Sequence, residues 1–135
     1  MTPSSIPLAG GASASAGRIE LHTHLEGSLT PARLIDLADK HGHPGLAAEC
    51  LDETGTRFVF EGFLGFLNLY KRITRLLQTP ADHHALALDL GEQLAADGVI
   101  YAEVSVSYGV LLKRERDPRP IQGALAEAAA EVEES

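Results

Sequence analysis

Two histidines, His22 and His24, have the residue type and the spacing that metal chemistry needs. A short apolar run precedes them, and an acidic loop containing Gly27 follows them. If the run is a β-strand, successive side chains alternate between its faces, so both imidazoles point the same way, about 7 Å apart along the backbone. At this separation two imidazoles can converge on one divalent ion, at metal–nitrogen distances of roughly 2.0–2.1 Å. The alternative is a pair of packed or hydrogen-bonded histidines.

The residues that follow predict where this pair lies in the fold. Gly27 and the Thr30-Pro31 pair end the strand, so both histidines are expected near its C-terminal end. Thr30 suits a helix N-cap, Pro31 suits the first helical position, and Gly42 suits the helix stop. In parallel α/β folds, active sites are built at the C-terminal ends of the strands. The pattern therefore predicts a metal site at that end of an α/β fold.

Residues 45–78 predict helical structure after this first unit. Residues 45–50 could form one short helical turn, and residues 58–78 have the three- and four-residue periodicity of an amphipathic helix. We expect the apolar stripe of the second helix to face the core. It consists of Phe60, Phe63, Leu67, Tyr70, Thr74 and Leu77.

The last third of the chain predicts a helix, a strand and a helix. Thr79-Pro80 suits a helix start, and Gly98 suits its end. Residues 99–107 are β-branched and almost continuously apolar, which predicts a parallel, buried strand. Glu103 within it would need a polar partner, because burying a lone carboxylate is costly. The final helix is expected to start near Pro118 or Pro120.

Four further histidines are not expected to be metal ligands. Adjacent residues on a helix diverge by about 100°, so neighbouring histidines do not easily share an ion. We expect surface or capping positions for His41, His43, His83 and His84.

Composition excludes several classes of protein. The 135 residues carry a formal net charge of −8, with 11 basic and 19 acidic residues, so a nucleic-acid partner is not expected. Cys50 is the only cysteine, which excludes an intrachain disulfide and the Cys-x-x-Cys zinc site of cytidine deaminases, and favours a cytoplasmic location. No apolar run is long enough to span a membrane, so no membrane partner is expected.

Residues 1–17, rich in Ala, Ser, Gly and Pro, are expected to form a disordered tail before a domain at 18–135.

Two segments resemble the adenosine/adenine deaminase family of the metal-dependent amidohydrolases. The first is Leu21-His22-Thr23-His24-Leu25-Glu26-Gly27-Ser28-Leu29, and the second is Tyr101-Ala102-Glu103-Val104. The resemblance implies a (β/α)8 barrel in which His22 and His24 bind one Zn²⁺ per full-length subunit. Because such a barrel typically needs about 250 residues, the chain is expected to be an incomplete, N-terminal part of it.

The same resemblance implies three substrate-binding residues. Glu26 would bind the sugar or its equivalent, and Gly27 would let the backbone approach the ligand closely. Phe63, in a Phe-Leu pair that matches the family's lid helix, would cover the purine. The alternatives are a solvated loop carboxylate for Glu26 and a core-facing side chain for Phe63.

The implied activity is zinc-dependent hydrolytic deamination of a 6-aminopurine: adenosine, adenine or 6-aminodeoxyfutalosine. The last branch is slightly favoured, because the segment after the second strand lacks the Ser-Pro of typical adenosine deaminases. No catalytic residue of the family matches this chain, so we expect residues 1–135 alone to be inactive and to bind zinc poorly. Two alternatives stay open: another His-x-His hydrolase of the TatD or PHP type, and a non-catalytic barrel remnant.

Overall fold

The computed structural model describes residues 5–7 and 16–135, and of 5–7 the backbone alone. Its sheet has the strand order β1-β2-β3, with bounds Ser5–Pro7, Arg18–His24 and Val99–Ser105. β1 is antiparallel to β2, and β2 is parallel to β3. The predicted tail therefore contains a short strand at Ser5–Pro7, whereas the prediction for 1–4 and 8–15 falls outside the described residues.

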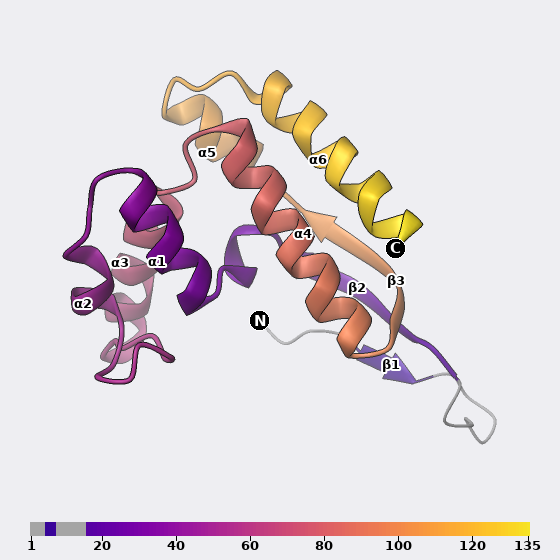
Figure 1. Cartoon of the computed structure of the whole chain (residues 1–135), viewed down its shortest axis with the longest axis horizontal. Coiled ribbons are helices and arrows are strands. Elements are labelled where there is room, and N and C mark those ends of the chain that lie inside the picture. Colours follow the sequence, from indigo (N-terminus) through magenta and orange to yellow (C-terminus); the bar gives the residue numbers. More distant parts are fainter. Residues whose placement is uncertain (1–4, 8–15) are drawn as a thin grey trace.

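Helices connect β2 to β3 and follow β3, as the sequence predicted (Figure 1). A single 3₁₀ turn, η1, covers Glu26–Ser28. Of the described helices, none has the length and apolar character needed to cross a membrane. The α-helices are α1 (Pro31–Lys40), α2 (Leu46–Cys50), α3 (Gly62–Thr74), α4 (Pro80–Ala96), α5 (Tyr108–Lys113) and α6 (Pro118–Glu134).

The starts of the helices follow their predicted capping residues. The Thr30 hydroxyl accepts a hydrogen bond from the Arg33 N–H at 3.1 Å, and Pro31 follows as the first residue of α1. At α4, Thr79 and Asp82 form a capping box in which each side chain accepts from the other's backbone N–H. Side-chain caps satisfy N–H groups that have no partner within the helix. The predicted boundaries of α1 and α4 are confirmed.

The core lies between the helices rather than inside a closed sheet. α4 crosses the sheet, and α6 lies alongside α4 (Figure 1). A Cβ at Gly91 of α4 would lie only 2.4 Å from Val132 Cγ2 of α6, so the two helices pack too closely there for any larger residue. The fully or almost fully buried apolar side chains include Leu25, Leu34, Leu37, Leu76, Leu77 and Leu86.

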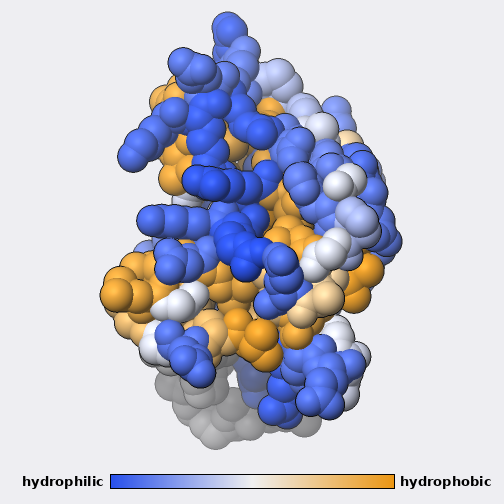
Figure 2. Space-filling model, turned by 90° about the vertical axis from the view of Figure 1, so that its left-hand side faces the viewer, coloured by the Kyte–Doolittle hydropathy of each residue, from blue (hydrophilic) through white to orange (hydrophobic). Residues whose placement is uncertain are grey.

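The phenylalanine-rich segment differs from its prediction. α3 begins at Gly62 instead of 58, and its buried residues are Leu69, Ile73 and Thr74. Phe63 and its neighbour Leu64 are 72% and 74% exposed, so the expectation that Phe63 faces the core is wrong. Spacing alone predicts which side chains share a face of a helix, and does not predict whether another element covers that face. Figure 2, which views the end with α1, α2 and α3, shows hydrophobic side chains on the lower part of this surface.

β3 also differs from its prediction, because it is parallel but not buried. Ile100 is 71% exposed and Tyr101 is 54% exposed. No described strand pairs with the outer edge of β3, and α4, which contacts this strand, leaves both side chains largely exposed. Glu103 is exposed too, and accepts a hydrogen bond from the Tyr101 hydroxyl at 2.8 Å. Glu103 therefore has a polar partner, as predicted, but the prediction that its carboxylate is buried is wrong.

Candidate metal and substrate site

His22 and His24 lie at the C-terminal end of β2, at the end of the sheet where the sequence placed them. Their Nε2 atoms are 3.2 Å apart, and the two rings meet edge to face with centroids 4.9 Å apart. Both side chains are exposed. The two rings therefore lie on the same side of the strand and are open to solvent. The prediction that both imidazoles point the same way is confirmed.

The separation of the two nitrogens fits a shared metal ion. Two nitrogens bound to one tetrahedral Zn²⁺ at about 2.05 Å are separated by roughly 3.3 Å. The observed 3.2 Å between His22 Nε2 and His24 Nε2 is close to this value. The same contact can be a hydrogen bond if one Nε2 carries a proton and the other accepts it. The donor set is therefore suited to a divalent ion that prefers imidazole.

The pair supplies only half of such a site. Within residues 16–135, no group of three or more His, Cys, Asp or Glu side chains could hold a metal ion. Catalytic zinc sites normally use three protein ligands and one open position. The remaining ligands would have to come from elsewhere in the barrel.

Glu26 is buried, so the alternative of a solvated loop carboxylate is wrong, and its substrate-binding role stays a prediction. It lies in η1 and is 7% exposed. Its Oε2 accepts a hydrogen bond from the Ser107 N–H at 2.9 Å, and its Oε1 lies 3.5 Å from the Ser107 hydroxyl. Glu26 follows β2 and Ser107 follows β3, so the carboxylate ties together the two loops at this end of the sheet.

Ser107 and Tyr70 are neighbours of Glu26 that the sequence analysis did not identify. Tyr70, on α3, lines the same cleft as Glu26 and Ser107, and burial, aided by the charge of Glu26, raises the pKa of its hydroxyl. A general rule could have found Ser107, because loops that follow neighbouring parallel strands meet at one edge of the sheet. No local pattern indicates Tyr70.

The other two predicted substrate residues have few contacts. Gly27 is exposed, and a Cβ there would meet only the Cβ of His24 at 3.8 Å, an ordinary contact distance. Phe63 projects from the first turn of α3 and is largely exposed. The structure thus leaves both available to a ligand, and their binding role stays a prediction.

The remaining histidines lie away from this pair. His41 and Asp82 are in contact, with Nε2 2.7 Å from Oδ2, and His84 lies 3.2 Å from Glu131. His83 is 1% exposed, with Nδ1 3.0 Å from the Thr79 carbonyl oxygen, so the prediction of a surface position is wrong for it.

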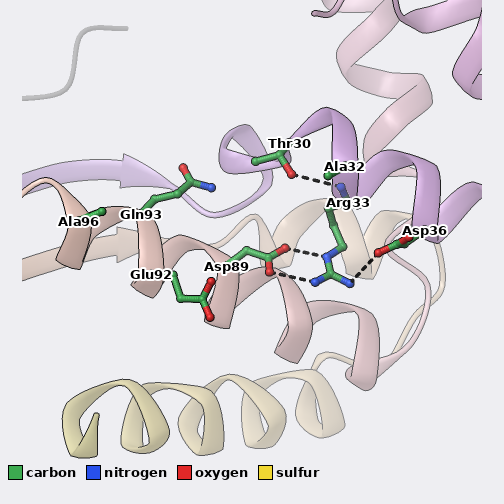
Figure 3. Close-up of a pocket in the computed structure, with 8 residues that line it drawn as sticks. All are labelled: Thr30, Ala32, Arg33, Asp36, Asp89, Glu92, Gln93 and Ala96. Carbon is green, nitrogen blue, oxygen red and sulfur yellow. Dashed lines mark hydrogen bonds and ion pairs between the residues drawn. The ribbon is translucent and has the colours of Figure 1, made fainter. Parts of the chain in front are cut away.

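A cavity of about 370 Å³ lies between α1 and α4, and charged side chains of both helices line it (Figure 3). Arg33 donates two hydrogen bonds to Asp89, at 2.6 and 2.9 Å, and lies 3.7 Å from Asp36. The hydrogen bonding to Asp89 raises the pKa of Arg33 despite partial burial. The Arg33–Asp89 pair thus joins α1 and α4 across this cavity.

Comparisons with known proteins agree with this geometry. The adenosine deaminase family model matches residues 17–134. Adenosine deaminases of Mycobacterium avium (strain 104) and Mycobacterium leprae (strain TN) are 36% and 38% identical over 88 residues, which is 62% of this chain and 24% of each relative. The chain therefore spans about a quarter of the length of these curated relatives.

A solved structure extends the match to the fold. Adenine deaminase from Arthrobacter aurescens has a TM-score of 0.68 and 28% identity, over 86% of this chain and 35% of that chain. The match confirms the predicted α/β fold class, an incomplete (β/α)8 barrel. The proteins of this group are in general metal-dependent, as the paired imidazoles lead one to expect. The family model covers residues 17–134, and the geometry of the two histidines agrees with it. The chain therefore belongs to the adenosine deaminase family.

Proposed function

We propose that the protein of which this chain forms part hydrolytically removes the 6-amino group of a purine base or nucleoside, using zinc. The observation that carries the proposal is the 3.2 Å separation of His22 Nε2 and His24 Nε2 at the C-terminal end of β2. The names of the matched proteins, adenosine deaminase and adenine deaminase, support a 6-aminopurine as the substrate class.

His22 and His24 would hold the ion as two neutral imidazoles. Zinc, when bound, lowers the pKa of a bound water to about 7 and so supplies a nucleophile at neutral pH. Each histidine must keep Nε2 unprotonated to serve as a ligand, which requires any remaining ring proton to be on Nδ1. Their exposure leaves them accessible both to the ion and to further ligands.

Glu26, Gly27 and Phe63 would bind the substrate. The Oε2 of Glu26 is engaged by the Ser107 N–H at 2.9 Å, which fixes the carboxylate and leaves Oε1, with only a 3.5 Å contact, for a polar group of the ligand. Gly27 offers exposed backbone beside His24. Phe63, largely exposed on α3, would cover the apolar purine face and restrict bulk water.

The experiment compares the 135-residue chain with the product of the complete open reading frame that encodes it. We expect the longer product to retain zinc and to deaminate adenosine or adenine, and the 135-residue chain to do neither well. His22→Ala and His24→Ala in the longer product should each abolish turnover and lower zinc stoichiometry. Tight zinc binding with turnover by residues 1–135 alone would contradict the proposal that the rest of the site lies elsewhere. A reading frame that ends at Ser135 would favour a non-catalytic remnant.

A further inference from the structure

The cleft that Glu26, Ser107 and Tyr70 line has a volume of about 520 Å³ and lies between the C-terminal half of α3 and α5. Four basic residues also line it: Lys71 of α3, Arg75 directly after α3, Lys113 at the end of α5 and Arg114 directly after α5. Lys71 and Arg75 are four positions apart in helical backbone, so they lie on one face. Arg116, two residues after Arg114, donates a hydrogen bond to the Gln78 carbonyl oxygen at 2.6 Å.

This concentration of positive charge is unusual for the chain. Five of its 11 Lys and Arg residues lie in or beside one cleft, although the formal net charge is −8. Four of the six other basic residues have carboxylate partners: Arg33 has Asp89, Lys40 has Asp82, Arg72 has Glu49 and Arg119 has Asp117. In the described part of the chain, none of the four lining cations has a carboxylate within ion-pair distance.

The cations also act unfavourably on one another. Arg114 is half-buried, and burial together with the charges of Arg75 and Arg116 lowers the pKa of its guanidinium. Like charges gathered around a partly desolvated cavity cost folding free energy. A bound anion would remove that cost. Arginine guanidinium groups, with their planar fork of N–H donors, match the oxygens of phosphate and carboxylate groups.

We propose that the α3–α5 cleft binds the oxyanion group, phosphate or carboxylate, of a small molecule through Arg75, Arg114, Lys71 and Lys113. The volume of about 520 Å³ is within the range of small-molecule sites, and a single phosphate occupies a fraction of it. The site therefore takes an anionic group that is part of a larger ligand.

Glu26 is the one carboxylate that lines the cleft, and it does not cancel this charge. It is buried, and its Oε2 already accepts the Ser107 N–H at 2.9 Å, so part of its charge is compensated within the protein. Against this single anion stand four lining cations and Arg116 beside them. The balance at the cleft stays positive.

The test measures thermal unfolding and calorimetric binding of the 135-residue chain with sodium phosphate, sodium malonate, and sodium chloride at equal ionic strength. A ligand that binds only the folded state raises Tm in a saturable way, whereas screening by chloride does not saturate at one site. We expect a saturable rise with phosphate, malonate or both. Phosphate alone identifies a phosphate site, malonate alone identifies a carboxylate site, and both indicate a general oxyanion site. No saturable rise with either anion would overturn the proposal.

Variants separate the cleft from general charge effects. Arg75→Gln/Arg114→Gln should weaken phosphate or malonate binding at least tenfold, and should leave unliganded Tm unchanged or higher because repulsion is relieved. The matched control is Arg57→Gln/Arg119→Gln, which removes the same charge at exposed positions outside the cleft and should bind as the parent does. If the double variant Arg75→Gln/Arg114→Gln has a lower Tm without ligand, a second double variant is measured. It is Lys71→Gln/Lys113→Gln, whose two positions in the cleft are exposed. Equal losses in cleft and control variants would overturn the site. Neither readout involves zinc or turnover, so this proposal and the deaminase proposal can fail separately.

Discussion

Asp82 at the start of α4 is buried and paired, whereas His22 and His24 at the C-terminal end of β2 are exposed. Asp82 of α4 has a fully buried carboxylate held by Lys40, by His41 and by two backbone N–H groups. The Nε2 atoms of His22 and His24 contact each other at 3.2 Å and are open to solvent. The carboxylate of Asp82 is thus satisfied within the protein, whereas the two imidazoles are accessible to a ligand.

The hydrophobic residues show the same contrast. Leu34 and Leu86, on α1 and α4, are completely buried, whereas Ile100 on β3 is 71% exposed. Leu34 and Leu86 pack in the core among the helices, whereas no described strand pairs with the outer edge of β3. We therefore expect the stability of the fold to depend on the region around α4, and ligand binding to depend on the open end of the sheet. Four predictions test this division.

The largest effect is expected from Asp82→Asn. The change leaves Lys40 and His41 without their carboxylate and weakens four hydrogen bonds around the start of α4, so we expect a loss of about 3 kcal/mol in the free energy of unfolding. Urea denaturation followed by circular dichroism measures it. Asp39→Asn, at an exposed position on α1, is the control and should stay within about 0.5 kcal/mol of the parent. Equal effects would show that stability is not concentrated at Asp82.

The second prediction concerns acid. Burial alone would raise the pKa of Asp82, but Lys40, the backbone N–H groups of Thr79 and Gln78, and His41 hold that pKa well below its usual value. Because the folded pKa lies below the unfolded value of about 3.9, the stabilisation is present above pH 4 and is lost as pH falls below it. Urea midpoints from pH 6 to pH 2 should fall more steeply for the parent than for Asp82→Asn. Parallel curves for the two proteins would contradict the assignment.

The third prediction concerns the contact between α4 and α6. Alanine is normally better than glycine in a helix by about 1 kcal/mol, but a Cβ at Gly91 would lie 2.4 Å from Val132 Cγ2. We therefore expect Gly91→Ala to lower the free energy of unfolding by roughly 1–2 kcal/mol, as overpacked cores do. Val132→Ala should restore part of the loss in the double variant.

Gly123, on the partner helix α6, is the matched control for Gly91. A Cβ at Gly123 meets nothing within 4 Å, so Gly123→Ala should raise stability by up to about 1 kcal/mol. Thermal unfolding of the four variants gives both signs in one experiment. A stabilised Gly91→Ala would show that the helices can separate without cost.

The smallest effect on stability is expected at the open end of the sheet. His22→Ala and His24→Ala remove exposed side chains, so each should change the free energy of unfolding by no more than about 0.5 kcal/mol without metal. Each should nevertheless weaken zinc binding measurably, because one of two imidazoles is lost. Zinc titration by calorimetry of the product of the complete open reading frame, with His43→Ala as an exposed control, measures this difference. A large loss of stability would place the pair in the structural region instead.

The sequence by itself determined the features that depend on neighbouring residues. Thr30-Pro31 and Thr79-Pro80 marked the starts of α1 and α4, because a cap and its N–H partner lie within one helical turn. The spacing of His22 and His24 likewise determined that both rings lie on one side of a strand, because side chains alternate along it.

Only the tertiary structure decided which surfaces are covered and which distant groups meet. It buried His83 and Glu26, left Phe63 exposed, and formed α5, which no sequence pattern predicted. It also joined Glu26 to Ser107 and gathered Arg75 with Arg114 around one cleft. Periodicity tells which residues share a face of a helix or strand. What packs against that face depends on elements far away in the chain, and on how many of them are present.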